Sequence, residues 1–199
     1  MTSRRELQRQ ETRRRLYESA LTVFRRDGYH DCSIEEIARV AGVSRGTFYF
    51  HFPTKDAVLE DLFVEAEAEF VEAVITLPET ATIEEVLDAS ATAMARRWSP
   101  EPKLWQAVGL VALQSTAQKL AQNQTLGIRQ ALGQRFQLAA GRGEVSLLVD
   151  PQVLSDFYLA NAFAVAVSWS TDPSIMPLEQ VLRGAAFLFL HGVKAPPAL

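Results

Sequence analysis

The sequence has few of the features that mark secreted or membrane proteins. Cys32 is the only cysteine, so no disulfide can form within the chain, which favours a reducing compartment. The longest apolar run, around residues 160–169, is interrupted by Asn161 and Ser168 and is too short to cross a bilayer. The charged start of the chain lacks the apolar segment of a secretory signal. We therefore expect a cytoplasmic protein with no membrane partner.

Residue patterns for catalysis are also scarce. The chain has three histidines, and we find no metal-ligand cluster, no glycine-rich phosphate loop and no nucleophile with a suitable histidine and acid partner. His51 is the one candidate base, and it lies in a segment that has a different interpretation below. An enzyme is therefore the least favoured hypothesis, and we expect neither a cofactor nor a bound metal.

The charges are unevenly distributed along the 199 residues. The net charge is −4, but residues 1–56 hold 11 Lys and Arg against 8 Asp and Glu, whereas residues 57–199 hold 9 against 16. With 48% apolar residues the chain can form a complete core in one domain or two small ones. A basic head on an acidic body is typical of proteins in which only the head contacts nucleic acid. We predict a head domain over 1–56 and a second domain over 57–199.

Helical signals occupy almost all of the chain. Alternating β-branched segments joined by Asn-Gly or Asp-Gly turns are absent, so we predict an all-α fold of about nine helices. Thr82 with Glu85 forms a capping box, and Asp150-Pro151 is a helix start with proline at the first helical position. Between them we expect a short helix over 104–113 and a longer one over 114–140.

Residues 33–55 read as two short helices joined by a tight turn. Ser33 caps the first helix, and Gly42 supplies the backbone conformation that the turn requires. Ser44 caps the second helix, which ends before Pro53. Phe48 and Phe52, four residues apart, would anchor that helix in the core, leaving the opposite face polar. This arrangement predicts a helix-turn-helix whose second helix enters the DNA major groove.

The outward face of this second helix carries groups suited to DNA. Arg45 can donate two hydrogen bonds to a guanine, and Gly46 allows close backbone approach. Thr47 can reach a phosphate or place its methyl group against a thymine methyl. The remaining polar groups suit phosphate contacts, which position a protein without specifying sequence; they are the helix N-termini at Ser33 and Ser44 and the side chains of Tyr49, His51 and Lys55.

The segment GYHDCSIEEIARVAGVSRGTFYFHFPTKDAVLEDLF resembles the DNA-binding head of the TetR family of transcriptional regulators. The resemblance covers residues 10–64. It implies an all-helical homodimer that represses transcription and releases its DNA when a small molecule binds the C-terminal domain. It places Arg45, Gly46, Thr47 and Phe50 at base contacts and Tyr49, His51 and Lys55 at phosphate contacts. Glu35 stands where a basic or polar residue would help, because its charge repels phosphate.

Several large apolar residues of the second domain are candidates for lining an effector pocket. An apolar pocket would imply a small-molecule effector that is itself largely apolar. The alternative is that these residues form ordinary core. The candidates are Met94, Trp98, Trp105, Val108 and Phe136.

The last two helices are apolar on more than one side, so they need partners on more than one side. We expect them to pair with their two-fold mates in a four-helix dimer interface, and the resemblance implies the same. Such a dimer would read a pseudo-palindromic, double-stranded operator. A ligand-independent regulator and a transcriptional activator remain as alternatives. The predicted interface residues are Phe157, Ala160, Ala164, Val167, Leu182, Ala186 and Phe189.

Overall fold

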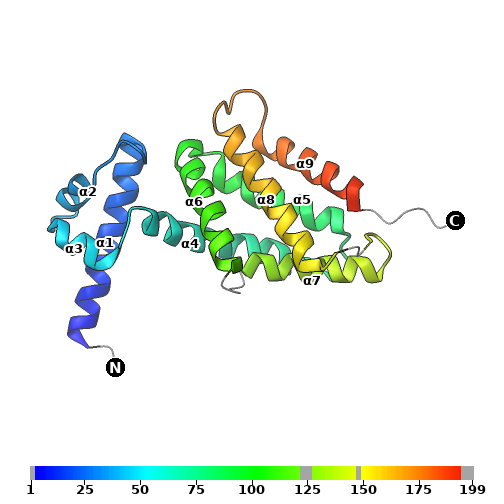
Figure 1. The fold of residues 1–199 in the computed structure, drawn as a ribbon, viewed down its shortest axis with the longest axis horizontal. Coiled ribbons are helices and arrows are strands. Elements are labelled where there is room, and N and C mark those ends of the chain that lie inside the picture. Colours follow the sequence, from blue (N-terminus) through cyan, green and yellow to red (C-terminus); the bar gives the residue numbers. More distant parts are fainter. Residues whose placement is uncertain (1–2, 122–126, 147–148, 194–199) are drawn as a thin grey trace. The chain divides into compact units, whose positions relative to one another are not determined.

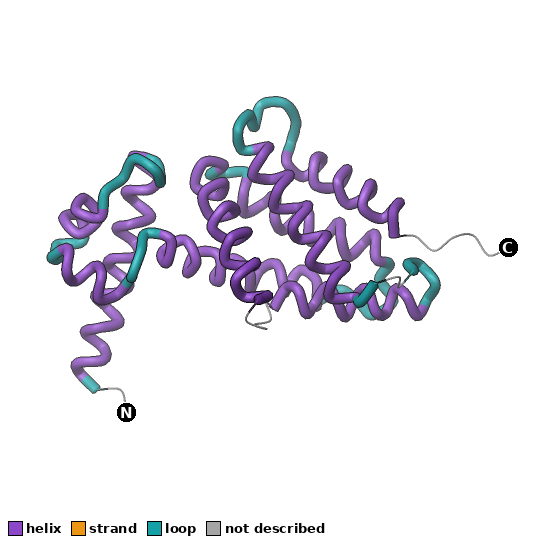
Figure 2. Tube along the Cα trace, in the orientation of Figure 1, coloured by secondary structure: helices purple, strands orange, loops and turns teal. Residues whose placement is uncertain are grey.

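The computed structural model describes residues 3–121, 127–146 and 149–193. Within these ranges the chain forms nine α-helices and no strand, which confirms the predicted fold class (Figures 1 and 2). The chain divides into two compact units, Met1–Leu62 and Phe63–Leu199. The division falls inside a helix, a few residues after the boundary expected from charge. No helix of the described ranges is long and apolar enough to cross a membrane.

The first unit consists of α1 (Arg4–Asp27), α2 (Ile34–Val40), α3 (Arg45–His51) and the start of α4 (Asp56–Ile75). Ser3 caps α1, and Gly28, with φ +86°, ends it. One side of α1 packs against α2. The apolar side chains buried at the centre of the unit come from all four helices and include Leu16, Ala20, Val23, Ile37, Phe48, Phe52, Val58 and Leu59.

The second unit contains the rest of α4 followed by α5 (Ile83–Trp98), α6 (Pro102–Ala121), α7 (Gly127–Gly141), α8 (Pro151–Trp169) and α9 (Leu178–Val193). α8 packs against α6, α7 and α9, while α5 packs against α9 and α7 (Figure 1). The starts of α5 and α8 agree with the sequence: the Thr82–Glu85 capping box is formed, and Asp150 caps a helix that begins with Pro151.

One boundary in the second unit was predicted wrongly. A break was expected between residues 113 and 114, but α6 runs without interruption from Pro102 to Ala121. The helix expected over 114–140 is divided between the end of α6 and α7. Gly109 lies inside this helix for a packing reason, because a Cβ atom there would come within 2.5 Å of Trp98 Cη2 and 2.8 Å of Val167 Cγ2. The glycine therefore allows a close approach of α6 to its neighbours.

Candidate nucleic-acid interface

The turn between α2 and α3 is built by local hydrogen bonds. The Ser33 and Ser44 hydroxyls accept hydrogen bonds from the backbone N–H groups of Glu36 and Thr47, at 3.1 Å each. Gly42 has φ +66°, and the Val43 N–H donates to the Ala38 carbonyl at 3.0 Å. The sequence pattern at the two serines and the glycine therefore predicted this geometry correctly.

Helix α3 has one buried face and one exposed face. Phe48 and Phe52 are fully buried, and their rings lie 5.8 Å apart. The other face leaves Phe50 72% exposed and Tyr49 42% exposed; Arg45 and Gly46 are exposed as well, and Thr47 is half-buried. All of the side chains predicted to contact bases therefore lie on the solvent side of one short helix, held rigidly by two buried aromatic rings.

Arg45 is not alone on this face. Its guanidinium forms an ion pair with the Glu35 carboxylate at 2.6 Å and also lies over the Tyr49 ring, 5.5 Å from the ring centroid. The side chains of Arg45 and Glu35 are 60% and 57% exposed, so water screens the pair. Because Glu35 comes from α2, it brings a negative charge to the tip of α3, where DNA phosphates would otherwise meet only positive groups.

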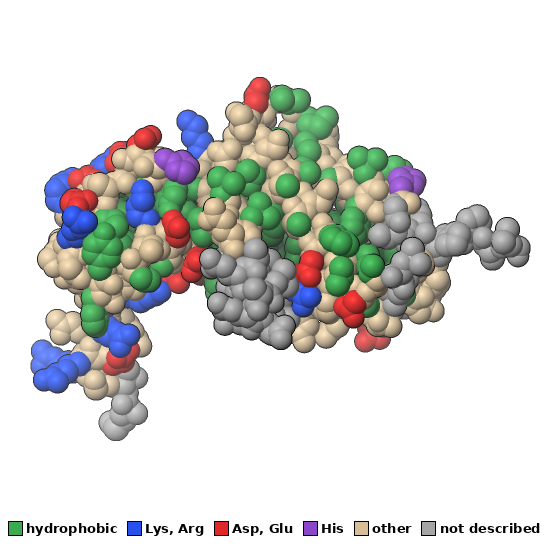
Figure 3. All heavy atoms as spheres, in the orientation of Figure 1, with side chains coloured by type: hydrophobic (Ala, Val, Ile, Leu, Met, Phe, Trp, Pro, Cys, Tyr) green, Lys and Arg blue, Asp and Glu red, His purple; other side chains and the backbone are tan. Residues whose placement is uncertain are grey.

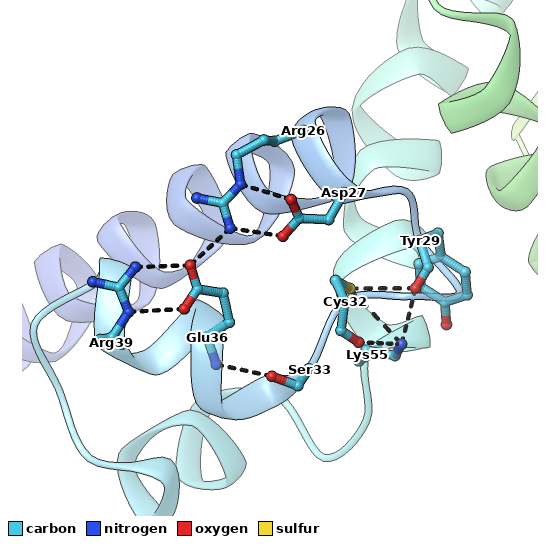
Figure 4. Close-up of polar contacts among 8 residues, drawn as sticks. All are labelled: Arg26, Asp27, Tyr29, Cys32, Ser33, Glu36, Arg39 and Lys55. Atoms are coloured by element: carbon cyan, nitrogen blue, oxygen red, sulfur yellow. Dashed lines mark hydrogen bonds and ion pairs between the residues drawn. The ribbon is translucent and has the colours of Figure 1, made fainter.

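One of the groups expected at phosphates, the Lys55 ammonium, is engaged within the protein. Lys55 donates hydrogen bonds to the carbonyl oxygens of Tyr29 and Cys32, both at 2.9 Å, and its ammonium lies 4.8 Å from the Tyr29 ring centroid (Figure 4). The Tyr29 hydroxyl donates in turn to Asp56. Lys55 thus fastens the loop after α1 to the start of α4, and its phosphate role stays a prediction.

The other predicted phosphate contacts have different surroundings. His51 is partly buried at the end of α3, and this burial lowers its pKa, as do the positive charges of Arg9 and Arg13. The imidazole is therefore held neutral near pH 7.

The single cysteine lies close to this site. Burial raises the pKa of the Cys32 thiol, more than the nearby Lys55 lowers it. Cys32 consequently lacks the thiolate character of a reactive cysteine.

A charged brace connects α1 to α2. Glu36 accepts hydrogen bonds from Arg39 on its own helix and from Arg26 on α1, at 2.7–2.8 Å, and Arg26 also holds Asp27 (Figure 4). The hydrogen bonds to Arg39 and Arg26 lower the pKa of Glu36 to about 2. The brace holds α2 against α1.

Positive charge is concentrated on the first unit. Figure 3 shows that most of the visible Lys and Arg side chains lie over it.

In the second unit the five pocket candidates are all buried, between 0% and 6% exposed. Trp98 stacks at a tilt on Trp105 with ring centroids 5.9 Å apart, and its indole N–H donates to the Ser170 hydroxyl at 2.6 Å. Phe136 lies in another aromatic group, with Phe189. The structure therefore brings the two tryptophans together but places Phe136 among different neighbours. Met94 and Val108 are buried as well.

The predicted interface residues of α8 and α9 fall into two groups. Phe157, Ala160 and Ala164 are exposed on one side of α8, and Val167 is half-buried. On α9, Leu182 and Ala186 are buried within the chain, and Phe189 packs against Tyr158 and Phe136. The exposed positions of α9 include the glycine and apolar residues Gly184, Phe187 and Leu188 instead. These α9 side chains face into the unit because α9 packs on α5 and α8, and the dimer interface itself stays a prediction.

Arg135 is a structurally important residue whose role was not predicted from the sequence. It is 7% exposed, and its guanidinium donates to the carbonyl oxygens of Val74, Ile75, Leu77 and Pro78 at 2.5–3.2 Å. It therefore satisfies carbonyl groups at and just beyond the C-terminal end of α4, which a helix end leaves without partners. An arginine spaced among apolar residues of α7 was the only sequence signal, and it did not identify the partner.

The comparisons with known proteins agree with this geometry. Residues 16–62 match the family model described as bacterial regulatory proteins, tetR family. The chain is 47% identical over 51 residues to the HTH-type transcriptional regulator SrpR of Pseudomonas putida, a match that covers 26% of this chain and 24% of that regulator. The chain thus spans about a quarter of the length of this curated relative.

Similarity to solved structures extends over nearly the whole chain. The Thermus thermophilus repressor FadR, in complex with lauroyl-CoA, is 25% identical, with a TM-score of 0.76 over 94% of this chain and 98% of that one. The Bacillus subtilis regulator FadR, in complex with stearoyl-CoA, has a TM-score of 0.66 at 20% identity and covers 89% of this chain and 97% of that one. At 20% identity, the similarity to the B. subtilis FadR shows a shared fold only.

Proposed function

We propose that this chain, which belongs to the TetR family of bacterial regulatory proteins, is a homodimeric regulator that binds operator DNA and represses transcription until a small molecule releases it. The observation that carries this proposal is α3, a short helix anchored by buried Phe48 and Phe52. Its opposite face exposes Arg45, Gly46 and Phe50, with Thr47 half-buried among them. Its small and polar exposed side chains suit a groove lined with base edges.

In the proposed complex α3 lies in the major groove of cytoplasmic DNA. Arg45 reads a guanine, while Gly46, Thr47 and Phe50 contact neighbouring bases. The N-termini of α2 and α3 at Ser33 and Ser44 point backbone N–H groups at phosphates, and Tyr49 and His51 contact the same strand. The Lys55 ammonium donates to Tyr29 and Cys32, so in this proposal it positions the loop after α1 near the phosphates.

The proposed dimer uses the exposed apolar surface of α8 and α9. Phe187 is 56% and Leu188 73% exposed, and the small residues Ala160, Ala164 and Gly184 are exposed on the same two helices. Exposed apolar patches of this kind are typical of protein–protein contacts, and small residues allow helices to approach closely. Two copies joined in this way would present two α3 helices to successive major grooves, about 34–36 Å apart.

The dimer proposal is tested by hydrodynamics. We expect the wild type to sediment as a dimer, and Leu188→Glu and Ala164→Arg to give folded monomers, because each puts a charge into the proposed contact. Val64→Glu on α4, an exposed position with a similar change in charge, is the matched control and should leave the dimer intact. Dimers in all four proteins would contradict this interface.

We propose a largely apolar effector that binds the second unit. The interior of this unit is apolar and aromatic around Trp98 and Trp105, and the T. thermophilus FadR, which covers nearly the same length of chain, holds lauroyl-CoA. The effector can release DNA only by binding one dimer conformation more tightly than the other. Lauroyl-CoA is therefore the first compound to test, beside uncharged apolar compounds.

The complete function is tested in two steps. A genome-wide binding map gives operators, and fluorescence anisotropy on an operator duplex then follows release as lauroyl-CoA or another compound is added. Release at micromolar effector supports the proposal. Operator binding that no compound disturbs would favour a ligand-independent regulator. Increased transcription of the adjacent genes on binding would identify an activator, and absence of any mapped site would overturn the proposal.

A further inference from the structure

The N-terminal half of α1 carries a strip of arginines that the DNA-reading motif does not use. The side of α1 that is buried in the core at Leu16 and Ala20 continues towards the N-terminus as Arg13, Arg9 and Arg5, at four-residue spacing. Residues four apart on a helix lie on the same face. The N-terminal part of α1 therefore extends beyond the apolar core with the same side facing α3. On that side the apolar residues are followed, towards the N-terminus, by three arginines.

Contacts to α3 and its C-cap fix where this strip lies. The Arg9 guanidinium is 5.8 Å from the ring centroid of Phe50, an exposed residue of the recognition helix, and the Arg13 guanidinium is 4.5 Å from that of Phe52. Both arginines also lower the pKa of His51 through their charge, after the larger effect of burial. The strip thus adjoins the face of α3 that is proposed to enter the major groove.

The arginines of the strip differ in how far their charge is already neutralised. Arg13 is bound to Asp61 at 2.5 Å and serves the fold of the unit. Arg9 is 61% exposed and reaches Glu6 only at 3.8 Å. For Arg5 no ion pair is found within the described part of the chain. Arg5 and Arg9 therefore carry positive charge that is available to a partner.

We propose that Arg5 and Arg9 form a second DNA-contacting element, which binds backbone phosphates beside the base pairs read by α3. This inference rests on the proposed function and adds to it a site that lies outside the family match, because that match begins at residue 16. The two residues are separated by about 6 Å along the helix axis, and long flexible arginine side chains reach neighbouring phosphates at this spacing.

The chemistry of the strip favours phosphates over other partners. A helix with side chains is about 10–12 Å across, too wide for the roughly 6 Å minor groove, and the major groove is occupied by α3. A membrane surface would require an apolar face, and residues 4–11 include Leu7 as their only large apolar side chain. Phosphate contact by guanidinium groups remains, and it adds affinity without sequence preference.

The test uses the full-length dimer and an operator duplex selected by the wild type from random sequence. The variants are Arg5→Gln, Arg9→Gln and the double variant, with affinity measured over a range of salt concentrations. Each phosphate contact contributes about 0.9 to the slope of log affinity against log salt, so the double variant should reduce the slope by about 2. We expect it to weaken binding by roughly tenfold or more near 0.1 M salt, with unchanged sequence preference.

Arg14→Gln is the matched control, since it removes one positive charge from the opposite side of the same helix. Arg14 is held by Glu11 and Glu18, at 2.8 and 2.5 Å, and its variant should keep the wild-type slope. Circular dichroism should give the same helical content for all variants.

The failures can be told apart. A wild-type slope in Arg5→Gln/Arg9→Gln would overturn this inference and leave the proposed function standing. An altered base preference in that variant, or an equal slope change in Arg14→Gln, would also overturn it. A wild type that selects no duplex at all would overturn the proposed function, and this inference with it.

Discussion

Replacing Arg135 by methionine should destabilise the second unit more than almost any other single polar substitution. Its guanidinium donates to four carbonyl oxygens at and beyond the end of α4, and it is 7% exposed. The bond to Val74 is buried and the other three are part-buried, and each buried acceptor left without a donor costs about 1–3 kcal/mol. Methionine also removes the cost of burying a charge, and the Pro78 carbonyl keeps a bond from Ala81, so the expected net loss is about 2–4 kcal/mol.

This loss can be measured by tryptophan fluorescence during thermal unfolding. All three tryptophans, Trp98, Trp105 and Trp169, belong to the second unit, so their signal reports that unit. For a unit of this size a loss of 2–4 kcal/mol lowers the midpoint by roughly 5–12 °C. The matched control is Arg142→Met, which removes bonds to the carbonyls of Glu79 and Ala81 from a side chain that is 32% exposed.

The control should shift the midpoint by much less, because water can replace the donors that Arg142 supplies. An Arg135→Met midpoint within about 2 °C of wild type would refute the reasoning, as would an equal or larger shift in Arg142→Met, since the proposed cost depends on buried carbonyls.

Three further predictions concern DNA binding. Arg45→Ala should weaken operator binding about tenfold to a hundredfold and relax the preference at one base position; uniform weakening on all sequences would make Arg45 a phosphate contact. Glu35→Gln should strengthen binding to operator and random duplexes alike by a few-fold, because it frees Arg45 and removes a charge that repels phosphate, while Tyr49 still supports the guanidinium; weaker binding would show that Glu35 positions Arg45. His51 has a lowered pKa in the free protein and a phosphate favours its charged form, so operator affinity should rise as the pH falls through and below the usual histidine value near 6.5, and His51→Gln should abolish that rise.

The pH dependence of folding stability at His51 is opposite in sign to the pH dependence of operator affinity. A histidine whose pKa is lowered in the folded chain contributes stability that is complete above the unfolded value and is lost as the pH falls through the folded one. Acid therefore strengthens the proposed DNA contact at His51 while weakening the fold around it. Unfolding and operator binding measured over the same pH range separate the two effects.

The sequence was most informative where structure is local. Ser33, Ser44, Thr82 and Asp150 each cap the helix predicted for them, because a cap depends on hydrogen bonds between residues two or three positions apart. The helix-turn-helix could be predicted for the same reason. The exposed face of α3 could be predicted as well, because Phe48 and Phe52 occupy the buried side of this short helix.

The errors arose where the answer depends on packing between distant segments. The expected break after residue 113 does not occur, because α6 continues to Ala121. The close approach of Gly109 in α6 to Trp98 and to Val167 of α8 likewise could not be read from the sequence. The α9 residues Leu182 and Ala186 share the apolar character of Phe187 and Leu188, and only the packing of α9 on α5 and α8 separates buried from exposed. Arg135 similarly acquires its role from α4.

The most direct test of the account is selection of DNA by the full-length protein from a random duplex library, with the number of chains per duplex determined by sedimentation. We expect an enriched pseudo-palindrome whose half-sites are centred about one helical turn apart, bound by two chains or a multiple of two. Enrichment of no sequence, or of a single unrepeated half-site bound by one chain, would contradict the claim that paired α3 helices read an operator.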